Sequence, residues 1–189
     1  MKTFELKGSK RESTGKKAAK AYREESLVPC ILYGGNEVVH FTVTKESIRK
    51  LIYTPEVFTV NLSIEGKEYT AILKETQFHP VSDALLHADF LQIFPDKPVV
   101  LEIPIVLEGL AQGVRDGGKL SMNMRKLKVK GLYKNLPEKL VINIENLGLG
   151  KTVQVGNLNF DNLELMNNKD NVVAAVQLTR AARGMAAKG

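Results

Sequence analysis

Hydrophobic and polar residues alternate along much of this chain, with the two-residue period of β-strands that bury one face. The stretches TFELK, VVHFTVT and HADFLQI each predict a strand, and the apolar run VPCILY predicts a short buried one. VFTVNLSI and KEYTAILKET flank the dipeptide Glu65-Gly66, so they predict a β-hairpin. The first half of the chain is therefore expected to be rich in strands.

Two segments follow the longer period of helices instead. Before the first of them, the segment GSKRESTGKK has nothing apolar to bury and is expected to be a loop. A helix of about two or three turns is predicted over KKAAKAYREES, with Ser13 or Thr14 as its N-cap. A second helix is expected over KESIRKLIY, after Thr44. The expected apolar faces are Ala18, Ala19 and Tyr22 in the first helix and Ile48, Leu51 and Ile52 in the second.

The segment PDKP, residues 95–98, combines two prolines with two charges and is the best candidate for a domain boundary. We therefore expect a first domain at residues 1–94, a linker at 95–98 and a second domain at 99–180. The second half has no long helical pattern and stays β-rich. Its expected strands are VVLEIPIVLEG, SMNMRKLKVKGL, KLVINIE, TVQVGNL and VVAAVQLT. Residues 181–189 have almost nothing to bury and are expected to be a disordered tail.

The composition fits a globular protein with a proper core, because 43% of the 189 residues are hydrophobic. A single cysteine excludes an internal disulfide. No apolar stretch is long enough to span a bilayer, and the first residues lack the apolar region of a secretory signal. The sequence thus predicts a cytoplasmic protein without a membrane partner.

Positive charge is concentrated in two stretches. Residues 7–23 contain seven Lys or Arg and one acidic residue, whereas residues 24–98 contain six basic and eleven acidic ones. Residues 115–139 contain eight basic residues and two acidic ones. Such clusters favour a polyanionic partner over a diffuse surplus of charge. In the second stretch Lys126, Lys128 and Lys130 alternate with Leu127 and Val129, so those lysines are expected on the wet face of a half-buried strand.

Two segments resemble a phosphate-binding P-loop, which has the form G-x-x-x-x-G-K-[ST]. GVRDGGKL offers Leu120 where a hydroxyl must hold magnesium, and ENLGLGKT begins with Glu145 instead of glycine. A P-loop must also open a helix, whereas both segments lead into predicted strands. We interpret them as turns that contain a lysine.

His87 and Asp89 lie two residues apart in a predicted strand and should share its outer face, while Ala88 and Phe90 face inward. A hydrolase would need a nucleophile, either Cys30 or a serine, although Cys30 lies among apolar neighbours. A metal site would require His40, His79 and His87 to converge, but their spacing follows no ligand pattern. A local His–Asp hydrogen bond and RNA recognition stay open, and the basic segment favours RNA.

The chain resembles the long form of the bacterial large-subunit ribosomal protein numbered twenty-five, also called the general stress protein CTC family. The resemblance covers nearly the whole sequence. It rests on Arg11, Gly15-Lys16 through Arg23, Val28-Pro29, Leu32-Tyr33-Gly34, Gln77, His79-Pro80, His87-x-Asp89-Phe90, Gly113-Val114, Gly117-Gly118-x-Leu120, Val129 and Leu147-x-x-Gly150.

The resemblance implies a mainly β fold, with an N-terminal six-stranded β-barrel that carries short helices and a separate β-rich C-terminal domain. It implies binding to the widened minor groove of loop E in 5S ribosomal RNA, and stabilisation of the central protuberance of the large ribosomal subunit. It implies no catalysis, and no metal or other cofactor is expected. Neighbouring ribosomal proteins or 23S rRNA are the expected partners of the C-terminal domain. A stress-induced, ribosome-associated role is the alternative.

Carried over to this sequence, the resemblance and the basic segment give a set of expected RNA contacts. These are Lys10, Arg11, Lys16, Lys20, Arg23, Tyr33, Gln77, His87 and Asp89. Lys20 replaces the family's usual arginine, and it loses the planar fork that can grip a phosphate with two hydrogen bonds. Ala21 and Glu24 occupy commonly basic positions, and Ser26 replaces a usual glycine. Electrostatic affinity is therefore expected to be weaker here than in typical members.

Overall fold

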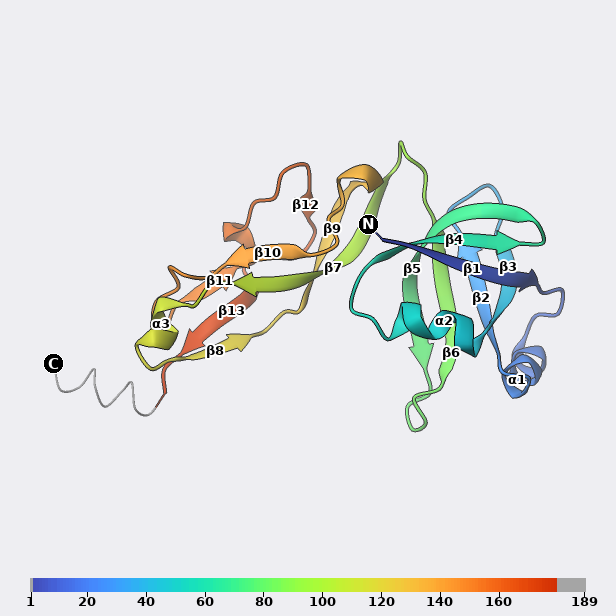
Figure 1. Ribbon diagram of the computed structural model, residues 1–189, viewed down its shortest axis with the longest axis horizontal. Helices are drawn as coiled ribbons and strands as arrows, with labels where there is room; N and C mark the ends of the chain where they lie inside the picture. Colours follow the sequence, from blue (N-terminus) through green and yellow to red (C-terminus); the bar gives the residue numbers. More distant parts are fainter. Residues whose placement is uncertain (1, 180–189) are drawn as a thin grey trace. The chain divides into compact units, whose positions relative to one another are not determined.

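The computed structural model describes residues 2–179, so the tail predicted at 181–189 lies outside the described residues. The chain divides into two compact units. The first extends to Val99 and includes the short segment Leu132–Lys134, and the second comprises Val100–Gly131 and the described residues from Asn135 onward. Both units consist mainly of strands, as Figure 1 shows, so the predicted fold class is confirmed.

The first unit is a closed six-stranded barrel with the strand order β1-β3-β2-β6-β5-β4. Its strands are β1 (Lys2–Lys10), β2 (Leu27–Tyr33), β3 (Val39–Thr44), β4 (Phe58–Ile64), β5 (Lys67–Phe78) and β6 (Leu85–Gln92). Closure leaves no exposed sheet edge, because every strand has a partner on both sides. The predicted hairpin is β4 and β5, joined by Glu65 at φ 48° and Gly66 at φ 81°, as a two-residue turn of primed type requires.

Strand β1 is longer than the sequence pattern predicts. Gly8, Ser9 and Lys10 belong to it, whereas they were expected in a loop. The pattern fails here because Gly8 has no side chain to mark a buried position. A Cβ atom at Gly8 would lie 2.7 Å from Cδ2 of Phe41, so glycine is what lets the strand pass over this ring.

Two short helices flank the barrel, α1 (Lys16–Glu24) and α2 (Lys45–Ile52). Helix α2 begins as predicted, with the Thr44 hydroxyl accepting a hydrogen bond from the backbone N–H of Ser47 at 3.4 Å. Helix α1 corrects the predicted cap. Its N-cap is Gly15, at φ 100° and without a side-chain hydrogen bond, so neither Ser13 nor Thr14 caps it. No residue of α1 is fully buried, as its weak apolar pattern suggests, and the predicted face of Ala18, Ala19 and Tyr22 is half-buried.

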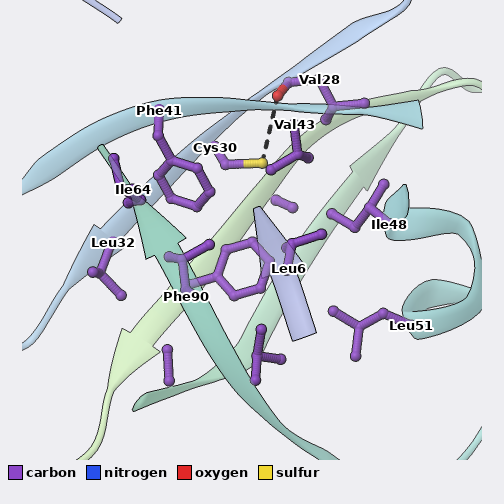
Figure 2. Packing of buried hydrophobic residues seen from close by; sticks show 14 of the residues in the cluster. Leu6, Val28, Cys30, Leu32, Phe41, Val43, Ile48, Leu51, Ile64 and Phe90 are labelled. Carbon is purple, nitrogen blue, oxygen red and sulfur yellow. Dashed lines mark hydrogen bonds between the residues drawn. The ribbon is translucent and has the colours of Figure 1, made fainter. Parts of the chain in front are cut away.

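The barrel interior is a continuous apolar core (Figure 2). The rings of Phe41 and Phe90 lie at its centre, with centroids 5.6 Å apart. Leu6 of β1 contributes from the opposite wall, and Ile48 and Leu51 of helix α2 close one side. Inward side chains of β6 thus anchor the strand whose outer face carries His87 and Asp89.

The second unit contains two small sheets, with the orders β10-β7-β9-β12 and β11-β13-β8. Its elements are β7 (Pro98–Glu108), α3 (Gln112–Arg115), β8 (Lys119–Met122), β9 (Lys126–Leu132), η1 (Tyr133–Asn135), β10 (Leu140–Asn143), β11 (Thr152–Gln154), η2 (Val155–Asn157), β12 (Glu164–Leu165) and β13 (Val172–Gln177). The labels η1 and η2 denote 3-10 helices. The first two residues of η1 belong to the segment Leu132–Lys134, which is part of the first unit.

One predicted strand of the second unit is wrong. SMNMRKLKVKGL forms two strands in different sheets, β8 and β9, because the chain turns away between them. The backbone N–H groups of Asn123 and Met124 both donate to the carbonyl of Val173, which ends the pairing of β8 with β13. The two-residue strand β12 was not predicted, since Glu164–Leu165 is too short to show a period.

Candidate nucleic-acid interface

His87 and Asp89 form a hydrogen-bonded pair on the outer face of β6. Nδ1 of His87 donates to Oδ1 of Asp89 at 2.6 Å, and the two side chains are 23% and 27% exposed. Ala88 and Phe90 are fully buried on the inner face, so the predicted division of the strand is confirmed. The carboxylate fixes the orientation of the imidazole, while Nε2 and the second carboxylate oxygen stay available to a partner.

Neighbouring strands extend this pair into a polar surface. Gln77 of β5 lies opposite His87, and Glu75 lies opposite Asp89. On the other side of β6, Ile31 of β2 lies opposite Asp89. Glu75 was missed from sequence, although its position two residues before Gln77 could have suggested a shared face. The irregular register between Leu73 and Glu75 is what places it beside Asp89.

Tyr33 belongs to the same surface. Burial, followed by the negative charges of Asp89 and then Glu75, raises the pKa of the Tyr33 phenol above its ordinary value. The phenol therefore stays protonated at any physiological pH. It adds a neutral O–H group that can donate to a phosphate, a ribose or a base next to two carboxylates that can only accept.

Arg23 attaches helix α1 to the strand that carries the pair. Its Nε and Nη2 donate to the carbonyl oxygen of Leu86 at 3.1 and 3.0 Å. Nζ of Lys45 donates to the carbonyl of Arg23 at 3.2 Å and holds the end of the helix from the other side. Arg23 thus attaches the helix to β6 in the free protein. Of its three guanidinium nitrogens, only Nη1 takes no part in these two hydrogen bonds.

The other predicted basic contacts are more loosely held. Lys10, Lys16 and Lys20 are exposed. Lys20 lies 3.9 Å from Glu24, one helical turn away, but both side chains are mostly in solvent and such a pair is weak. Arg11 follows strand β1 directly and is half-buried, and its backbone N–H donates to the carbonyl of His40 at 3.0 Å.

The residues considered for catalysis do not form a catalytic group. Cys30 is completely buried inside the barrel, its Sγ lies 3.5 Å from the carbonyl oxygen of Val28 (Figure 2), and burial raises the pKa of its thiol far above the ordinary value. Such a thiol is not a nucleophile. Among residues 2–179, Asp89 is the only side chain hydrogen-bonded to His87.

The three histidines do not converge on a metal. His40 lies in β3 and His87 in β6, while Nδ1 of His79 accepts hydrogen bonds from the backbone N–H groups of Val81 and Ser82 at 3.3 and 3.2 Å. No group of three or more His, Cys, Asp or Glu side chains suited to a metal ion occurs in the described part of the chain. His79 therefore has a local role, which is to order the β5–β6 loop.

Two lysines of the second basic stretch form ion pairs at the surface of β9. Leu127 and Val129 of β9 are buried, and the lysines between them point outward, as predicted. Nζ of Lys128 lies 3.7 Å from Glu102, and Nζ of Lys130 lies 3.1 Å from Glu164. The two segments that resemble P-loops place Lys119 in β8 and Thr152 in β11, so neither opens a helix after its lysine.

Among residues 2–179, no helix could cross a membrane, since the longest two contain nine and eight residues.

Comparisons with known proteins match both units of the chain. A family model described as the Ribosomal L25p family matches residues 6–90, and one described as Ribosomal protein TL5, C-terminal domain, matches residues 98–180. The chain is 69% identical over 184 residues to a protein of Azobacteroides pseudotrichonymphae named Large ribosomal subunit protein bL25, with 97% of each chain covered. Proteins of the same name from Parabacteroides distasonis and Bacteroides fragilis are 60% and 57% identical, over 100% and 99% of this chain and 100% and 98% of theirs.

Proposed function

Because the chain belongs to the Ribosomal L25p family, and is therefore a structural, non-enzymatic component of the large ribosomal subunit, we propose that it binds 5S rRNA through the outer wall of its barrel. The proposed target is the minor groove of loop E, and the proposed consequence is a more stable central protuberance. Membership in the ribosome is also the reason to place the protein in the cytoplasm. Its binding surface comprises Lys10, Arg11, Lys16, Lys20, Arg23, Tyr33, Gln77, His87 and Asp89.

The observation that carries this proposal is the outward-facing His87–Asp89 pair beside a tethered basic helix. The 2.6 Å hydrogen bond gives the pair one fixed geometry, and the bonds from Arg23 to Leu86 hold helix α1 at the residue next to it. Basic side chains supply affinity for phosphates without sequence information, whereas a fixed polar pair can distinguish base edges. Affinity and specificity would thus come from adjacent parts of one surface.

The acidic side chains on this surface fit a minor groove better than they fit a phosphate backbone. Asp89 and the neighbouring Glu75 would repel phosphates but can accept hydrogen bonds. In a minor groove the donors are the N2 amino group of guanine and the ribose 2′-hydroxyls. We infer that Asp89 accepts from one of these donors, and that Gln77 and Nε2 of His87 contact neighbouring sugar or base-edge atoms.

The test is Asp89→Asn, which keeps the size of the side chain but changes one acceptor into a donor. Binding of the full-length protein to a loop E fragment should weaken about 10-fold or more, with much smaller loss on an unrelated RNA duplex, because only base contacts discriminate. Asp96→Asn, an exposed substitution of the same kind, serves as the control. Equal losses on the two RNAs would contradict the proposal.

We further propose that residues 1–94 form the RNA-binding domain, residues 95–98 the linker and residues 99–180 a domain that contacts neighbouring ribosomal proteins or 23S rRNA. The two family models, which match residues 6–90 and 98–180, support this division. Co-sedimentation of full-length protein with large subunits, with and without substitutions in the second domain, tests whether that domain adds to the attachment.

A further inference from the structure

Arg11 and His40 are neighbours across the β1–β3 pairing, on the outer face of the barrel. Lys10 lies opposite Phe41, and the next pair is joined by the hydrogen bond from Arg11 N–H to the His40 carbonyl. Phe41 is fully buried, so His40 projects outward. Residues directly opposite in an antiparallel pair project from the same face with Cβ atoms about 5 Å apart. The side chains of Arg11 and His40 therefore lie next to each other.

Each of these two side chains has a buried nitrogen without a hydrogen-bond partner among the described residues. They are Nε of Arg11 and Nδ1 of His40. Buried polar atoms are nearly always paired, so two unpaired ones on adjacent residues call for an explanation. The two are complementary, because Nε–H of arginine can only donate and Nδ1 of a neutral imidazole can accept. None of the ion pairs within residues 2–179 involves Arg11, although charges withdrawn from water usually have a partner.

The strand pairing connects Arg11 and His40 to the residues of the proposed RNA-reading surface. His40 is opposite Ile31, and Ile31 is opposite Asp89. Arg11 and Asp89 are thus separated by three strand spacings around the curved wall of the closed barrel. Burial is the main cause of the raised pKa of Cys30, the residue before Ile31, and the smaller effects include the charges of Arg11, which lowers it, and Asp89, which raises it. Arg11 is one of the residues of the proposed binding surface, so a partner held there is the partner that Asp89 would read.

We propose that His40 is a positioning residue for Arg11 in RNA binding. When the outer nitrogens of the guanidinium bind a phosphate, Nε–H of Arg11 turns to donate to Nδ1 of His40. The imidazole then carries its proton on Nε2, and both unpaired nitrogens acquire a partner. RNA binding would in this way supply the anion that Arg11 lacks in the free protein. This inference rests on the proposed function, since it names a further residue of the same interface.

The test compares His40→Phe, which keeps a ring but has no nitrogen, with His40→Asn, whose amide oxygen can replace Nδ1 as acceptor. Binding of the full-length variants is measured to a loop E fragment and to an unrelated duplex of equal length. His40→Phe should weaken binding about 5-fold to 10-fold on both RNAs, because a phosphate contact is independent of sequence. His40→Asn should restore most of the loss. In an Arg11→Ala background, His40→Phe should have no further effect.

Thr42→Val is the matched control, because Thr42 is the next residue on the same side of β3 as His40, and the substitution keeps the size of this buried side chain while removing one long hydrogen bond, from its hydroxyl to the Ser9 carbonyl at 3.4 Å. The inference would be overturned if His40→Phe bound RNA as tightly as the wild type. It would also be overturned if the losses of RNA affinity from Arg11→Ala and His40→Phe added up in the double variant. A loss of affinity that follows the loss of thermal stability in all His40 variants, Asn included, would also overturn it.

Failure of the proposed function has a different signature. It would appear as equal effects of Asp89→Asn on the two RNAs, while His40→Phe would still test the phosphate contact on either one. If the wild-type protein bound neither RNA, both the proposed function and the role of His40 would be wrong.

Discussion

The guanidinium of Arg23 donates two hydrogen bonds to the backbone carbonyl of Leu86, the residue directly before His87. Helix α1 has no fully buried side chain, and Ala18, Ala19 and Tyr22 are only half-buried, so this contact adds to a small apolar face in positioning the basic segment. The geometry suits arginine, whose planar group offers several donors in a fixed arrangement. A residue expected from sequence to contact RNA therefore also orders the surface that would do so.

We predict that Arg23→Ala lowers the free energy of unfolding by about 1 to 3 kcal/mol, because it removes two charge-assisted hydrogen bonds to a partly buried carbonyl. Urea denaturation of the full-length protein measures the change. Lys16→Ala removes the same charge from an exposed position and should alter stability by less than about 0.5 kcal/mol. Similar stability of the two variants would show that Arg23 does not tether the helix.

Affinity for RNA should depend strongly on salt. If about six phosphates are contacted by the basic segment, the logarithm of the association constant should fall with the logarithm of salt concentration at a slope of about −4 to −5. Titration of a loop E fragment at several salt concentrations measures this slope. Removing one phosphate contact, as in Lys16→Ala, should reduce its magnitude by slightly less than one unit. A slope near zero would rule out the electrostatic part of the model.

The thiol of Cys30 should be unreactive in the folded protein. Burial raises the pKa of the Cys30 thiol, so the reactive thiolate is disfavoured in the folded protein. A disulfide reagent such as DTNB should label native protein only at the rate of global unfolding, and unfolded protein at once. An exposed cysteine at Ser13 in a Cys30→Ala background provides the fast control. Rapid labelling of the native protein would contradict the closed barrel core.

The same thiol should link stability to alkaline pH. The unfolded thiol ionises near pH 8.5 and the folded one only at much higher pH, so above about pH 8.5 the folded state holds one more proton. Stability should therefore fall as pH rises, by at most about 1.4 kcal/mol per pH unit from this group. Cys30→Ala should lack this part of the pH dependence. Identical slopes in urea titrations of the two proteins at pH 8 to 10 would refute the assignment.

Gly8→Ala should destabilise the barrel by about 1 to 3 kcal/mol, as overpacking of a core usually does. The new Cβ would lie 2.7 Å from the ring of Phe41, which is fully buried in the barrel core. Ser9→Ala changes the next, exposed residue of the same strand and should be nearly neutral. Thermal melts of the two variants give the comparison, and equal melting temperatures would mean that the core yields at this point.

The sequence by itself determined most elements of the barrel and the division of β6 into two faces. Alternation places Phe90 inward and His87 with Asp89 outward, and Thr44 marks the start of α2. These features depend on residues only a few positions apart in the sequence, so the local periodicity is enough to predict them. The prediction failed where the local signal was weak, at Gly8 in β1 and at the cap of α1, where Gly15 takes the place expected of Ser13 or Thr14.

Only the tertiary structure decided which residues meet across strands. The neighbours Glu75 and Asp89, or Arg11 and His40, are far apart in sequence, and no period along the chain connects them. Their contact depends on the strand order of the closed barrel and on the register of each pair, where a shift of one residue would turn a side chain to the other face. The local pattern therefore determines whether a side chain faces into or out of the barrel, while strand order and register determine which side chains are its neighbours.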